Sequence, residues 1–334
     1  MVKPVAHPLH PSIASRIDSE YEAFHNDKLL YFMQVHEIPW SPAVRSGPTV
    51  PGGSQPLVVG TVKDYSTRES RAPWLRVFTP EGEPPAGGWP VFIFFHGGGW
   101  TLGNINSENA FSTNMCKYAK CVVVSVDYRL APENPYPAAV EDAVEALQWV
   151  HAKGQQLLAI NPDRIAVGGS SSGGNLAAVI ALKSSTLEPP IPLVFQLLVV
   201  PVTDNTATPE SMTHQSWKEN EFTTWLPAAK MIWFQDQYVP NVEDRTRWDN
   251  SPHFAPPELF SNAPPAWIGV TELDVLRDEG IAFGKKLTDA GKAVETKVYK
   301  GSPHPIMAMD GKISSGQQLV ADAAAALAKA FGGA

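Results

Sequence analysis

Three adjacent serines between a predicted strand and a predicted helix are the first residues in this sequence that suggest chemistry. They lie in the run Gly169-Ser170-Ser171-Ser172-Gly173. Only Ser171 has glycine both two positions before it and two positions after it. A sharp strand-to-helix turn strains its central residue and brings the flanking backbones close together, so small residues are needed at those positions. The flanks therefore favour Ser171 as a nucleophile; on this motif alone, a plain Gly/Ser-rich turn is the alternative.

A run of glycines after an apolar segment is the second signal. His96-Gly97-Gly98-Gly99-Trp100 directly follows VFIFF. Consecutive glycines leave the backbone without side-chain cover, so their N–H groups can point at a developing oxyanion. A phosphate-binding loop is the alternative, but the Lys-Ser/Thr pair of a P-loop does not follow. We expect a structural or loop-orienting role for His96, because it precedes the nucleophile in the chain.

A serine nucleophile requires a base and an acid that orients the base. Three histidines follow Ser171. His214 and His253 lie in or beside a long insertion, where surface or core roles are usual. His304 comes directly after a predicted strand that ends at Tyr299, and a loop there would deliver it to the C-terminal edge of the sheet. We predict His304 as the base.

Four acidic residues crowd the end of the predicted strand PAWIGVT. Asp274 is the first of them in the following loop and is the predicted acid, with Glu272 as the weaker candidate. Asp278 and Glu279 fit better as favourable charges in the first turn of the next helix.

Strands and helices alternate over most of the chain. After one or two N-terminal helices over 11–37, we predict strands at 57–62, 74–78, 91–95, 121–128, 164–168, 193–200, 266–271 and 293–299, with helices at 138–152, 175–185, 279–290 and 317–331. Almost wholly apolar strands such as VFIFF and CVVVSV require cover on both faces. The pattern predicts a mostly parallel sheet with helices on both faces.

About sixty residues between Asp204 and Ala263 interrupt this alternation, far more than an ordinary connection takes. Seven aromatic residues fall within 217–248. They can form the insertion's own core or line an apolar substrate pocket beneath a cap. The predicted substrate contacts are Trp100, Trp217, Phe222, Trp225 and Ile306.

Composition excludes several classes of protein. The 334 residues carry 26 Lys and Arg against 34 Asp and Glu, and this net charge of −8 disfavours a nucleic-acid partner. With 43% hydrophobic and 18% charged residues, the bulk of the chain is not disordered. Two cysteines are too few for a disulfide framework or a four-ligand zinc site. No export signal or membrane-spanning segment is visible, so we expect a cytoplasmic protein without a membrane partner.

The motifs together resemble those of the hormone-sensitive lipase family of α/β-hydrolases. They are HGGGW at 96–100 with Gly103, DYRLAPE at 127–133, PYPAA at 135–139 with Glu141 and Asp142, GGNL at 173–176, and DVLRDEG at 274–280. The resemblance implies an α/β-hydrolase fold with a helical cap and a serine ester hydrolase. It assigns the triad to Ser171, Asp274 and His304, and the oxyanion hole to backbone N–H groups of Gly97, Gly98, Gly99 and Ser172.

The resemblance also suggests how the chain is divided. We expect cap helices in 1–45, a catalytic domain in 57–204 and 264–334, and a cap insertion in 205–263. The mechanism needs no cofactor and no metal. The expected partner is a small ester of short to medium chain length, and a homodimer is left open.

The sequence departs from the family pattern at two sites. The family elbow usually reads Gly-Asp-Ser-Ala-Gly, whereas Ser170 and Ser172 replace Asp and Ala here, which removes a charge beside the nucleophile. The base is usually followed by Gly-Phe, whereas Pro305 and Ile306 follow it here. An amidase or lactonase with the same triad is the near alternative. A hormone-receptor-like binding module is the distant one, because all three triad positions are filled.

Overall fold

The computed structural model describes residues 6–47, 49–67 and 74–333; residues 1–5 of the predicted cap segment lie outside them. Within these ranges eight strands form one sheet, in the order β1-β2-β4-β3-β5-β6-β7-β8. Their bounds are β1 Thr61–Ser66, β2 Trp74–Thr79, β3 Trp89–Phe95, β4 Val122–Asp127, β5 Ile160–Ser170, β6 Phe195–Val199, β7 Ala266–Thr271 and β8 Val294–Tyr299. Strand β2 pairs antiparallel with both β1 and β4; the other neighbours are parallel. The predicted fold class is confirmed.

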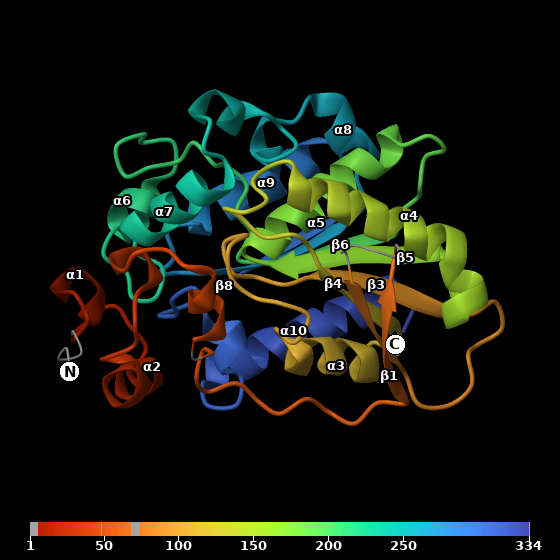
Figure 1. Ribbon diagram of the computed structural model, residues 1–334, viewed down its shortest axis with the longest axis horizontal. Coiled ribbons are helices and arrows are strands. Elements are labelled where there is room, and N and C mark those ends of the chain that lie inside the picture. Colours follow the sequence, from red (N-terminus) through yellow and green to blue (C-terminus); the bar gives the residue numbers. More distant parts are fainter. Residues whose placement is uncertain (1–5, 48, 68–73, 334) are drawn as a thin grey trace.

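Helices cover both faces of this sheet (Figure 1). The helices α4 (Ala138–Leu158), α5 (Ser172–Lys183), α8 (Pro257–Asn262) and α9 (Arg277–Asp289) lie above it in that view, and α3 (Asn109–Tyr118) and α10 (Ser314–Ala330) below it. Helix α5 is apolar around most of its circumference, because it packs against β5, β6 and α4 together. A helix enclosed in this way has to be hydrophobic on all sides.

Predicted and observed elements differ in several places. Strand β1 begins at Thr61, four residues after the predicted start, because only this stretch pairs with β2. Helix α4 continues past the predicted end to Leu158. Helix α3 is missing from the prediction. Its buried face includes Ser112 and Thr113 beside Phe111 and Met115, so it lacks the apolar periodicity by which helices are recognised.

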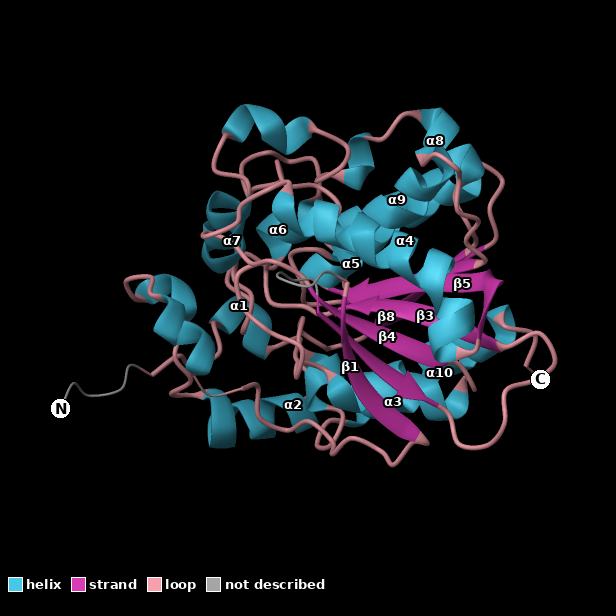
Figure 2. Cartoon of the chain, turned by 45° about the vertical axis from the view of Figure 1, so that its right-hand side comes forward, coloured by secondary structure: helices cyan, strands magenta, loops and turns pink. Residues whose placement is uncertain are grey.

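The N-terminal helices and the insertion gather at one end of the molecule. Helices α1 (Pro11–Ala14), α2 (Ser19–Phe24), α6 (Gln215–Glu219) and α7 (Ala228–Tyr238) lie there (Figure 2). They meet the loops that follow the parallel strands: the N–H of Asp18 donates to the carbonyl of Gly301, just after β8. This arrangement places both segments over the edge of the sheet where the candidate residues lie.

Candidate active site

Ser171 occupies a strained turn between β5 and α5. Its φ and ψ are 54° and −117°, and its N–H donates to the carbonyl of Val199 at 2.8 Å. A side chain at either flanking glycine would not fit: a Cβ on Gly169 would lie 2.2 Å from the carbonyl oxygen of Gly173, and one on Gly173 would lie 1.9 Å from that of Phe95. Such backbone strain persists only where the surroundings enforce it. Here they hold the Ser171 side chain out from the sheet edge.

The predicted base and acid meet this serine in space. His304 Nε2 lies 3.0 Å from Ser171 Oγ, and His304 Nδ1 lies 2.6 Å from Asp274 Oδ2. Asp274 follows β7 and has no exposed surface, and its Oδ1 accepts from the N–H of Leu276 at 3.0 Å. His304 follows β8 and is 8% exposed. Because each residue follows a different parallel strand, the sheet brings together three side chains that are distant in the sequence.

Side chains from the insertion hold the loop that carries Asp274. Asn220 Nδ2 donates to the backbone carbonyls of Glu272 at 3.0 Å and Asp274 at 2.9 Å. The hydroxyl of Thr223 donates to the carbonyl of Leu273. Glu272, the weaker candidate for the acid, points away from the base and accepts from the N–H of Gly301 at 2.8 Å. This favours Asp274 over Glu272 as the partner of the base.

The glycine loop after β3, residues 97–99, lies beside the strained turn at Ser171, which we call the elbow. Gly98 and Gly99 have φ values of 123° and 60°, which favour glycine. The N–H of Gly97, by contrast, donates to Glu108 Oε2 at 3.2 Å, so Gly97 is not available as an oxyanion donor and that prediction is wrong. Ser172 is the first residue of α5. Its N–H lacks an acceptor within the helix, as at every helix N-terminus. Gly98, Gly99 and Ser172 remain candidate donors.

Two titratable side chains border this loop. Burial lowers the pKa of His96 to about 4, so its ring is neutral; Nδ1 donates to the carbonyl of Gly97 at 2.7 Å. The ring stacks on Tyr128, whose hydroxyl donates to the carbonyl of His96 at 2.7 Å. Desolvation raises the pKa of Glu108 to about 7. His96 thus has the loop-orienting contacts expected from its position.

The predicted substrate contacts are not gathered in one place. Trp100, Trp217 and Ile306 have no exposed surface. The Trp100 ring stacks on Tyr238 with centroids 4.1 Å apart, and the Trp217 indole N–H donates to Glu279 at 3.0 Å. These contacts give both tryptophans packing roles.

The other two predicted contacts lie where the cap segments meet. Phe222 is 52% exposed and packs on His10 with ring centroids 4.5 Å apart. Trp225 packs on Phe32 with centroids 5.1 Å apart. The aromatic density of the insertion therefore serves largely to join it to the rest of the chain.

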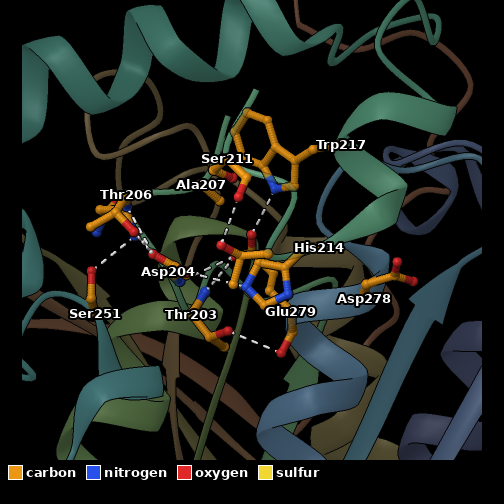
Figure 3. Close-up of polar contacts among 12 residues, drawn as sticks. Thr203, Asp204, Thr206, Ala207, Ser211, His214, Trp217, Ser251, Asp278 and Glu279 are labelled. Carbon is orange, nitrogen blue, oxygen red and sulfur yellow. Dashed lines mark hydrogen bonds and ion pairs between the residues drawn. The ribbon is translucent and has the colours of Figure 1, made fainter. Parts of the chain in front are cut away.

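Glu279 lies in the first turn of α9, as predicted, and is the centre of a buried polar cluster (Figure 3). Its Oε1 accepts from the N–H groups of Thr203 at 2.7 Å and Asp204 at 3.3 Å. His214 Nε2 lies 3.1 Å from Asp204 Oδ2, and burial together with the charge of Asp204 raises the pKa of Glu279. The sequence did not indicate this burial, which arises because the insertion covers the helix turn. Asp278 likewise accepts from the N–H of Ser216 at 2.8 Å.

The described part of the chain holds no group of three or more His, Cys, Asp or Glu residues that could bind a metal ion. No helix within it is long and apolar enough to cross a membrane. Cys116 and Cys121 are both buried as free thiols.

A family model described as the alpha/beta hydrolase fold matches residues 92–308. The chain belongs to this alpha/beta hydrolase family. The hydrolase is 46% identical to the AB hydrolase superfamily protein C1039.03 of Schizosaccharomyces pombe over 333 residues, 97% of either chain. It is 41% identical to the carboxylic ester hydrolase LipN of Mycobacterium tuberculosis over 241 residues, 68% of this chain and 62% of LipN.

A crystal structure of the esterase rPPE has a similar fold, with a TM-score of 0.81 at 30% identity, covering 94% of this chain and 97% of that one. LipN is named a carboxylic ester hydrolase and rPPE an esterase, and the chain is a carboxylic ester hydrolase.

Proposed function

We propose that this hydrolase cleaves short- to medium-chain carboxylic esters through an acyl-enzyme on Ser171, as a member of the hormone-sensitive lipase family. The observation that carries the proposal is the continuous chain of contacts from Ser171 Oγ through the His304 imidazole to Asp274, at 3.0 Å and 2.6 Å. Only this serine of the three has an imidazole nitrogen at hydrogen-bond distance among the contacts of the described residues.

Each residue has a defined task in the proposed reaction. His304 donates its Nδ1–H to Asp274, which leaves Nε2 to accept the proton of Ser171 as Oγ attacks the ester carbonyl. The alcohol then leaves with that proton, and the acyl group stays on Ser171. Water attacks the acyl-enzyme and gives its proton to His304. The bond to Oγ then breaks, His304 returns the proton to Ser171 Oγ, and the acid is released.

The negative oxygen of both tetrahedral intermediates needs donors fixed in advance. We assign this role to the N–H groups of Gly98, Gly99 and Ser172. One such donor typically contributes about 10²- to 10³-fold in rate. The donors are backbone groups, so their positions depend on how the surrounding loops are held.

We further propose that residues 6–45 and 205–263 form a cap that limits the size of the substrate. Phe234 of α7 supports this: a Cβ on Gly99 would lie 2.2 Å from Phe234 Cδ1, so the ring lies directly against the glycine loop. An aromatic ring so close to the oxyanion donors leaves room for short acyl groups more readily than for long ones.

A fluorophosphonate probe tests the nucleophile. We expect one phosphonyl group per chain, located by peptide mass spectrometry on Ser171, and none on Ser171→Ala. The variant Ser172→Ala should still be labelled at 171. Label on another serine, or full esterase activity in Ser171→Ala, would contradict the proposal. Initial rates on p-nitrophenyl acetate, butyrate and palmitate test the size limit, and a maximum at palmitate would overturn it.

A further inference from the structure

A carboxylate from another part of the chain lies beside the nucleophile, where the sequence had suggested that a charge was lost. Glu108 stands just before α3 with a φ of 58°. Its Oε1 accepts from the hydroxyl of Ser170 at 2.7 Å, and its Oε2 accepts from the N–H of Gly97 at 3.2 Å. Ser170 directly precedes the nucleophile, and Gly97 directly precedes the two candidate oxyanion donors in the glycine loop.

The position of this contact explains what it can do. Strands β3 and β5 pair in parallel, and the last paired residues are Phe95 and Gly169. Beyond them the ladder ends, and the two chains diverge into the glycine loop and the elbow. Glu108 bonds to Gly97 on one side and Ser170 on the other, just past that last pair. It therefore extends the connection between the two strands into the loops that carry the donors and the nucleophile.

The glycine loop needs such an external restraint. Glycine gives the backbone the most conformational freedom of any residue. A displacement of about 1 Å in a catalytic group can cost about 10²-fold in rate. Two neighbouring groups bind carbonyls at this loop: His96 Nδ1 donates to that of Gly97, and the Tyr128 hydroxyl donates to that of His96. Glu108 is the group that binds an N–H of the loop itself.

We propose that Glu108 is a positioning residue, which clamps Gly97 to Ser170 so that the amides of Gly98 and Gly99 face the substrate oxygen next to Ser171. This inference rests on the proposed function. Oxyanion donors act mainly on the transition state, so loss of the clamp lowers kcat and leaves KM nearly unchanged.

Two substitutions of Glu108 separate the effect of its two hydrogen bonds from the effect of its negative charge. In Glu108→Ala both contacts are lost. In Glu108→Gln the amide oxygen can accept from Gly97, and the amide N–H can donate to the Ser170 hydroxyl, which also accepts hydrogen bonds. Ser170→Ala removes one contact and keeps the other. Glu258→Ala, an exposed carboxylate on α8, is the matched control.

The test is steady-state kinetics on p-nitrophenyl butyrate together with inhibition by a trifluoromethyl ketone, which forms an oxyanion on the nucleophile. We expect kcat of Glu108→Ala to fall about 10²-fold with KM within about threefold, and the inhibition constant to rise as kcat falls. Glu108→Gln should keep kcat within about fivefold of wild type, and Ser170→Ala should lie between the two.

Several outcomes would overturn this assignment. They are an unchanged kcat in Glu108→Ala, a loss in Glu108→Gln as large as in Glu108→Ala, or a rise in KM that accounts for the whole effect. If Glu108→Ala does not fold, the Gln and Ser170→Ala variants decide. Fluorophosphonate labelling distinguishes failure of the positioning role of Glu108 from failure of the proposed function. Wild-type enzyme that is not labelled contradicts Ser171 as the nucleophile. Full labelling with normal kcat in the Glu108 variants contradicts only the positioning role.

Discussion

Gly173→Ala is the substitution for which the structure gives the clearest magnitude. The new Cβ would lie 1.9 Å from the carbonyl oxygen of Phe95 and 2.5 Å from that of His96, whereas real Cβ contacts stay above 3.0 Å. Both atoms belong to backbone, so no rotamer change can relieve the contact. Helix α5 and the end of β3 must separate by about 1 Å, and overpacking of this kind typically costs about 1–3 kcal/mol.

That separation moves the elbow away from the glycine loop, which follows His96. A misplacement of about 1 Å corresponds to about a 10²-fold loss in kcat. Gly284→Ala is the matched control, because Gly284 is also a helical glycine facing the sheet, but its Cβ would meet only the ends of the Ile268 and Thr296 side chains at 3.0 Å. The assays are kcat on p-nitrophenyl butyrate and the urea midpoint. Gly173→Ala with a kcat within threefold of wild type and an unchanged midpoint would refute the reasoning.

Two further predictions concern the insertion. Asn220→Ala removes both bonds from the insertion to the loop of Asp274, although Arg277 still donates to the same two carbonyls. We expect kcat on the same ester to fall about tenfold, since a loosened loop displaces the carboxylate and a misplacement of about 1 Å costs about 10²-fold. The exposed control Asn262→Ala should match wild type. In Glu279→Gln we expect a change in how stability depends on pH. Burial raises the pKa of Glu279 in the folded state. The contribution of this carboxyl to the free energy of unfolding is therefore complete below its unfolded-state pKa near 4.5, and it is lost as pH rises toward its folded-state pKa. The free energy of unfolding of wild type relative to the variant, from urea curves between pH 5 and 8, should therefore fall with pH by up to about 1.4 kcal/mol per unit, and a flat or rising difference would contradict this.

The predictable parts of the molecule are those that local pattern determines. The apolar runs of β3 and β7 are buried along their whole length, so composition alone identifies them. The glycines around Ser171 mark the elbow because their requirement is steric and local. The order of strands and loops then suffices to select His304 and Asp274 without any knowledge of distances.

The parts that could not be predicted depend on contacts between distant segments. Glu108 bonds to a residue 62 positions away, and nothing in its own neighbourhood indicates a role. Glu279 was correctly placed in a first helical turn, but its burial was not predicted because the insertion that covers it is remote in the sequence. Trp217 looked like a substrate contact for the same reason: aromatic density does not distinguish a residue that lines a cavity from one that fills a core.

The anchoring of Asp274 by Asn220 and Thr223 has a consequence for engineering. In this protein side-chain hydrogen bonds connect the insertion to the loop that carries Asp274. A chimera that exchanges residues 205–263 for those of a relative would also replace Asn220 and Thr223, whose side chains hold the loop of Asp274. Grafts aimed at new selectivity should therefore retain residues 216–223 and begin the exchange beyond them.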